Sequence, residues 1–164
     1  MYIALVWIHI VAAATWVGSM VFFAAAIVPT LRNETFRSVA PQLLAVVGRR
    51  FRMVGLVALS VLIASGVANL FARGLGWAAL SSADFWKSGF GSTLAHKIGL
   101  VFLVVILTGA HDLLFGTSAQ KKMASDPSGA EAQRSRKIAS WLGRTLLLLS
   151  LAILYLAVKL VRGM

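Results

Sequence analysis

Three histidines are the side chains of this sequence best suited to binding a metal ion. They are His9, His96 and His111, and the chain has no cysteine. The missing cysteines exclude disulfides, thiolate zinc sites, cysteine-ligated iron–sulfur clusters and thioether-linked haem. Neutral imidazole, by contrast, binds copper and haem iron. The sequence therefore predicts that any metal or cofactor is held by histidine, methionine, carboxylate or backbone groups.

The histidines occur in long apolar stretches, where an ionisable group is costly and by default indicates function. His9 lies roughly 10 Å below the start of the first stretch, at about 1.5 Å per helical residue. His96 lies near the start of the third stretch, which is expected to enter from the same side. Similar depth on two helices is what a bis-histidine haem or a metal ion requires. One alternative stays open, in which His9 hydrogen-bonds a neighbouring helix and His96 is a polar residue at headgroup level.

Further residues could complete such a site. Trp16 lies two turns from His9 on nearly the same helical face and could form the wall of a slot for a flat ligand. On the outer side, Lys97, Lys159 or Arg73 could neutralise haem propionates. Met20 and Met53 could offer soft copper ligands, but no methionine motif clusters them, and ordinary packing explains both.

A second polar group lies near the other end of the third stretch. His111 could be a third metal ligand or a proton carrier, and Asp112 is expected to pair with an arginine rather than to act as an acid. Arg144 of the fourth stretch could meet them, and we include it among the cofactor-binding candidates. Snorkelling to the membrane interface explains Arg144 equally well.

Composition places these residues in a membrane. Hydrophobic residues make up 59% of the 164-residue chain, charged residues 13%, and the mean hydropathy is +0.85. A soluble domain has about 25% charged residues, so lipid must supply most of the outer contact. The net charge of +11 suits anionic lipid headgroups and cytoplasmic loops rather than nucleic acid, which we exclude as a partner. The long first stretch has no preceding basic residue, so no cleaved signal peptide is expected.

Four stretches have the roughly 20 apolar residues that a membrane-spanning helix needs. We predict a single all-α domain over residues 1–164, an integral membrane four-helix bundle, with Pro29 ending the first span. The spans are residues 2–28, 53–71, 94–115 and 138–161.

The basic residues predict the orientation. Of sixteen Lys and Arg residues, five lie in residues 30–52 and six in residues 116–144. The positive-inside rule then places both termini outside (N-out, C-out) and these loops in the cytoplasm of a bacterial inner membrane. Residues 33–48 are expected to form a separate amphipathic helix capped by Asn33 or Thr35. Residues 74–93 are expected at the outer interface, and residues 118–136 in a polar, mobile loop.

The order of several motifs resembles the CopD-type membrane proteins over about residues 5–162. These motifs are His9 with Thr15 to Gly18, Ile27 to Arg32, Gly48 to Arg52, Ser65-Gly66, Lys97, His111-Asp112 and Ala139 to Arg144. The resemblance implies copper handling. The chain is also similar to the HemJ-type protoporphyrinogen oxidases, four-helix proteins that bind haem b, in which His9 and Lys97 would be important. The segment Pro29 to Arg32 departs from their usual Pro-Arg-Leu followed by Tyr-His.

Together these features predict an inner-membrane protein that binds copper, or iron as haem b, through His9, His96 and His111. A HemJ-like porphyrinogen oxidase and a metal-free scaffold are the alternatives. A homodimer is plausible, because four short spans are few for a transport pathway.

Overall fold

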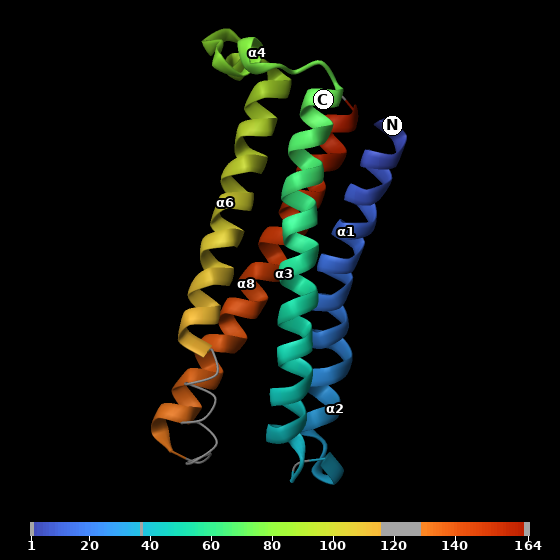
Figure 1. Cartoon of the computed structure of the whole chain (residues 1–164). Coiled ribbons are helices and arrows are strands. Elements are labelled where there is room, and N and C mark those ends of the chain that lie inside the picture. The colour runs from blue at the N-terminus through green and yellow to red at the C-terminus, as the bar shows by residue number, and fades with distance from the viewer. Residues whose placement is uncertain (1, 37, 116–128, 163–164) are drawn as a thin grey trace. The chain divides into compact units, whose positions relative to one another are not determined.

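The computed structural model describes residues 2–36, 38–115 and 129–162, and these residues contain helices and no strand. Contacts divide the chain into two compact units, Met1–Ser82 and Ala83–Met164. Each unit is built around one pair of long helices that lie side by side, α1 with α3 and α6 with α8 (Figure 1). The predicted all-α class is confirmed.

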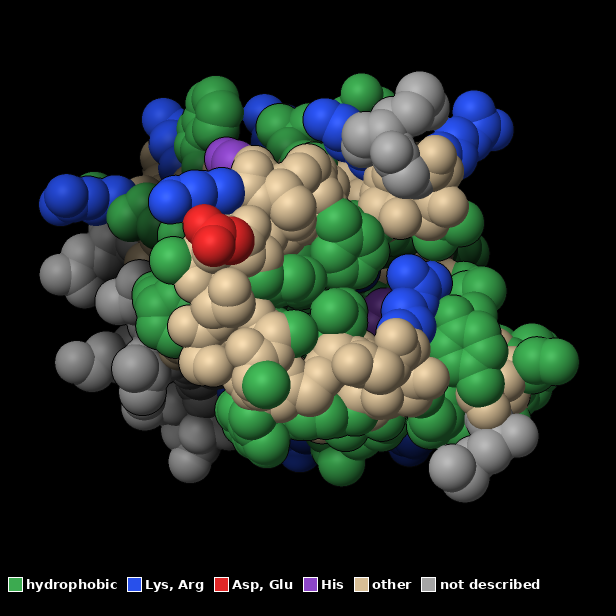
Figure 2. Space-filling model, turned by 90° about the horizontal axis from the view of Figure 1, so that it is seen from above, with side chains coloured by type: hydrophobic (Ala, Val, Ile, Leu, Met, Phe, Trp, Pro, Cys, Tyr) green, Lys and Arg blue, Asp and Glu red, His purple; other side chains and the backbone are tan. Residues whose placement is uncertain are grey.

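Four helices are long and apolar enough to cross a membrane: Tyr2–Arg32, Ala40–Ala72, Gly89–Ala110 and Gln133–Arg162. Large hydrophobic side chains are exposed along them, as Ile3 (82%) and Val161 (73%) show. Such exposed apolar flanks are stable in lipid, which cannot hydrate polar groups but contacts apolar ones as well as protein does. Figure 2 looks down on one end of the helices, where hydrophobic side chains are mixed with basic and other groups and acidic side chains are scarce. The number and character of these helices are those of a multi-pass membrane protein.

Pro29 does not end the first helix, contrary to the prediction. Helix α1 (Tyr2–Phe22) continues through a π-helical turn, η1 (Phe23–Ile27), into α2 (Val28–Arg32). A proline lacks an N–H and crowds the carbonyl four residues earlier. The wider turn just before Pro29, in which the Val28 N–H donates to the Phe23 carbonyl, provides an alternative hydrogen-bond pattern there. The helix therefore passes the proline instead of stopping.

The separate amphipathic helix expected in residues 33–48 is also not found. Asn33 Oδ1 accepts from the Thr35 N–H at 3.2 Å, but this turn precedes only the short 3₁₀ helix η2 (Glu34–Phe36). The next helix, α3, runs unbroken over Ala40–Ala72, so the basic segment and the second span are one helix. It ends at Ala72, and Gly74 just beyond has a φ of +81°, which favours glycine, while its N–H donates to the Phe71 carbonyl.

The connection after α3 contains two short helices, α4 (Trp77–Ser81) and α5 (Ala83–Lys87), where a loop was expected. Helix α6 (Gly89–Phe115) begins five residues before the predicted span, and α8 (Ala130–Arg162) eight residues before it. Residues 130–136, predicted to be polar loop, are therefore helical, whereas residues 116–128 lie outside the described chain. Val104, Leu146 and Ser150 are buried in this second unit.

Candidate functional site

The first candidate ligand, His9, lies on the face of α1 that packs against α3. Its Nδ1 is 2.8 Å from Oγ of Ser65, which is 6% exposed in the C-terminal part of α3. The His9 ring also lies close to Gly66, where an added Cβ would be 3.3 Å from Cε1. A small hydroxyl residue followed by glycine thus makes room for the imidazole and provides a hydrogen bond to it.

The hydroxyl of Ser65 indicates which nitrogen of His9 carries the proton. Ser65 Oγ lies 2.6 Å from the Val61 carbonyl, which can only accept, so the single hydroxyl proton is directed there. The same oxygen must then accept from His9 Nδ1–H. In the neutral imidazole this places the lone pair on Nε2, the nitrogen that can bind a metal.

Four non-aliphatic residues of the first helix follow one another at intervals of seven. His9, Trp16 and Phe23 contact α3, and Tyr2 contacts Arg73 just beyond it, as the sevenfold spacing of an interhelical seam predicts. The Arg73 Nε donates to Tyr2 Oη at 3.0 Å, and the Phe23 ring lies 4.9 Å from that of Phe51. The end of this seam near the N-terminus, at Tyr2 and His9, therefore carries polar contacts, and the other end, at Trp16 and Phe23, carries aromatic ones.

Trp16 belongs to the aromatic part of this seam. The residue is 6% exposed, and its ring lies 3.3 Å from where a Cβ on Gly55 would stand. The indole therefore packs against the glycine of the neighbouring helix. This packing gives Trp16 a structural role between α1 and α3, beside its predicted role as the wall of a ligand slot.

An acceptor in the polar part of the seam has no hydrogen-bond donor among the described residues. It is Oδ1 of Asn69, a buried atom one turn beyond Ser65 on the same face of α3. Leaving such an atom unsatisfied costs about 1–3 kcal/mol, so a bound group with a donor or a metal would be stabilised beside it. His9, Ser65 and Asn69 form what we call the polar seam.

His96 lies on α6 in the second unit and is exposed. Its Nδ1 is 2.7 Å from the Ser92 carbonyl, so Nδ1 carries the proton and Nε2 is the acceptor nitrogen here too. Because His9 lies in the first unit, a bis-histidine site depends on how the two units meet and stays a prediction.

The other predicted residues are dispersed over the second unit. Lys97 is half-buried on α6, and Arg144 is exposed, with its guanidinium 5.7 Å from the Trp141 ring centre. This cation–π contact fits a residue at a membrane interface. The side chains of His111 and Asp112 lie outside the described part of the structure. Among the described side chains no three His, Cys, Asp or Glu residues gather into a metal-ligand group.

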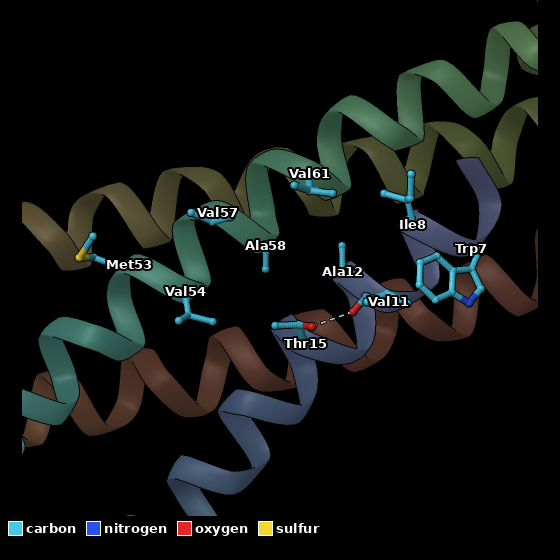
Figure 3. Close-up of a pocket in the computed structure, with 10 residues that line it drawn as sticks. All are labelled: Trp7, Ile8, Val11, Ala12, Thr15, Met53, Val54, Val57, Ala58 and Val61. Atoms are coloured by element: carbon cyan, nitrogen blue, oxygen red, sulfur yellow. Dashed lines mark hydrogen bonds between the residues drawn. The ribbon is translucent and has the colours of Figure 1, made fainter. Parts of the chain in front are cut away.

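An apolar groove of about 430 Å³ lies between α1 and α3 (Figure 3). From α1 it is lined by residues such as Trp7, Val11 and Thr15, and from α3 by residues such as Val57 and Val61. His9 is not among its lining residues, so this groove and the polar seam are different features of one hairpin.

Sequence reasoning identified His9 but missed its partners in the polar seam. Ser65 belongs to one of the motifs that resemble the CopD-type proteins, and Asn69 belongs to none of them. The signal was present, since both are polar residues within an apolar stretch and lie four positions apart on one helical face.

Comparison with known proteins adds one relative. An uncharacterized protein of Aquifex aeolicus (strain VF5) is 29% identical over 163 residues, which cover 95% of this chain and 92% of that protein. No family model matches the sequence. No solved structure matches it either.

Proposed function

We propose that this chain is a CopD-like protein of the bacterial cytoplasmic membrane that binds a transition metal, with His9 as the anchoring ligand. The observation that carries the proposal is the hydrogen bond from His9 Nδ1–H to Ser65 Oγ. Metal-binding histidines generally donate their second ring N–H to a fixed acceptor, which orients the ring and raises the basicity of the other nitrogen. A half-buried imidazole held in this way within a membrane helix suits a metal site.

The available donors favour haem iron over a copper ion. Copper bound by protein alone needs several converging ligands, usually soft ones, and the described side chains of neither unit provide three such His or carboxylate groups. Haem iron needs only one or two axial ligands, because the porphyrin supplies the rest. The oriented His9 of the first unit meets that requirement by itself, and His96 is a predicted second ligand. Haem b would supply one-electron redox chemistry.

The charges support the proposed orientation. The basic end of α3 carries Arg49, Arg50 and Arg52, and the N-terminal third of α8 carries Arg134 and Lys137. These ends are placed in the cytoplasm by the positive-inside rule. The polar seam, at the opposite end of α3, is then in the outer half of the membrane.

The test is an absorption spectrum of the detergent-purified protein from haem-replete cells, oxidised and then reduced, with metal analysis of the same sample. A Soret band that shifts on reduction is expected in the wild type and is expected to be lost in His9→Ala. His9→Met should keep haem but move the band, since a thioether changes the axial field. Thr15→Val is the matched control, because among the described residues the Thr15 hydroxyl bonds within its own helix, to the Val11 carbonyl.

A flat spectrum from wild-type protein would reject haem, and copper in the metal analysis would then support the copper form. With neither present, the structural alternative is favoured, since the His9–Ser65 bond by itself joins α1 to α3. An enzymatic role as a porphyrinogen oxidase requires, in addition, that the gene rescue a strain lacking that oxidase. His9→Ala and Lys97→Ala should abolish the rescue.

A further inference from the structure

The apolar groove of the first hairpin has the chemistry of a site for a hydrocarbon chain. Its one hydroxyl among the residues in Figure 3, that of Thr15, is satisfied by the Val11 carbonyl at 2.9 Å. The remaining lining is aliphatic side chains, Met53 and the ring of Trp7. Apart from the indole N–H of Trp7, these side chains offer a polar small molecule no further hydrogen-bonding group, whereas an acyl chain needs none. At about 430 Å³ the groove lies within the usual 300–1,000 Å³ range of ligand sites.

A basic residue stands in line with this groove. Arg50 precedes Val54, Val57 and Val61 by four, seven and eleven positions, so all four share one stripe of α3. Arg50 is exposed and makes no ion pair with any side chain that the structure describes. An anionic group at the end of the groove would therefore gain a charge partner without displacing another.

The stripe from Arg50 to Val61 is about as long as the hydrocarbon layer of one leaflet is thick. From Arg50 to Val61 the helix rises roughly 16 Å, at about 1.5 Å per residue. Half of the hydrocarbon core of a bilayer is about 15 Å thick. A lipid whose phosphate lies on Arg50 would thus lay one acyl chain along the groove down to the middle of the membrane.

We propose that this groove binds one acyl chain of an anionic phospholipid whose phosphate pairs with Arg50. The site is independent of the proposed metal-binding function, because its lining does not include His9. It assigns Arg50 a specific partner, beyond the general attraction of a chain of net charge +11 to anionic membranes.

The site can be tested by native mass spectrometry of the detergent-purified protein, titrated with equal amounts of phosphatidylglycerol and phosphatidylcholine. Wild-type protein should retain phosphatidylglycerol preferentially. Arg50→Gln should weaken that retention about fivefold, the loss expected for one basic residue at a lipid surface. Arg52→Gln removes the same charge two residues along, on the far side of α3, and should have no such effect.

A second pair of variants tests the apolar part. Val57→Trp fills the groove from a position that is 64% exposed, and should reduce retention of both lipids. Val67→Trp adds the same bulk to α3 away from the groove and should leave retention unchanged. Equal behaviour of the two arginine variants, or of the two tryptophan variants, would overturn the proposal. So would a Val57→Trp protein that changes its oligomeric mass while keeping its lipids, because the groove would then be covered by protein.

Discussion

Replacing Ser65 by alanine removes the hydroxyl that accepts a hydrogen bond from His9, and the resulting loss of stability can be calculated. The bond is 2.8 Å long, part-buried, and joins two membrane helices. Interhelical hydrogen bonds in membrane proteins contribute about 0.6 kcal/mol on average and about 1.7 kcal/mol at most. We expect Ser65→Ala to lower the free energy of unfolding by about 1 kcal/mol.

A double-mutant cycle isolates the interhelical part. The variants are Ser65→Ala, His9→Ala and both together, and the measurement is reversible unfolding in mixed micelles. The coupling between the two positions should be about 0.6 kcal/mol, an almost threefold change in the folding equilibrium. His9→Ala combined with Thr15→Val serves as the control cycle and should show no coupling, because the Thr15 hydroxyl bonds the Val11 carbonyl.

A coupling of zero within error would refute the argument that Ser65 holds the His9 imidazole. The same cycle followed by the Soret band adds a functional measurement. Ser65→Ala should keep the haem but shift its reduction potential or weaken its binding about 10- to 100-fold, the usual effect of removing a partner of a metal ligand. An unchanged spectrum and affinity would leave the bond a purely structural one.

Three further outcomes are expected. Gly55→Leu should force the Trp16 ring, which lies 3.3 Å from a Cβ at that position, out of the seam. The free energy of unfolding should fall by about 1–3 kcal/mol, and tryptophan emission should shift. Gly48→Leu is the control and should do neither, because a Cβ there meets nothing within 4 Å. Pro29→Ala should restore an ordinary α-helical turn and stabilise the helix by at most about 3 kcal/mol, seen as slower amide exchange around the π turn. Tyr2→Phe removes an exposed hydrogen bond and should change stability by less than about 1 kcal/mol; a larger loss on thermal unfolding would contradict this assignment.

The sequence predicted the number and type of the long helices but not their ends. Apolar residues indicate which part of a helix contacts lipid. Helices α3 and α8 extend beyond that part, over Ala40 to Arg52 and Ala130 to Lys137. The polar composition of residues 130–136 did not distinguish a loop from a continuing helix, and the largely apolar residues 40–48 predicted a helix but not its continuity with the second span. Pro29 predicts the end of a helix because proline lacks an N–H, whereas the π-helical alternative depends on the hydrogen bonds of its neighbours.

The sequence alone indicated individual residues of the candidate site but not which of them lie together. An ionisable residue in an apolar stretch draws attention by itself, as His9 did. Its partner depends on how α1 and α3 are rotated about their axes, which one sequence does not specify. The interval of seven from Tyr2 to Phe23 would have fixed one rotation, and with it the face on which Trp16 lies.

The unbroken course of α3 has a consequence for how the hairpin responds to membrane thickness. The 20 residues from Met53 to Ala72 are about 30 Å long, which matches an average hydrocarbon core. Arg49, Arg50 and Arg52 continue the same rigid rod and resist being drawn into the hydrocarbon, so the rod cannot slide inward. In a bilayer whose core is about 27 Å thick, α3 is therefore expected to tilt rather than to sink.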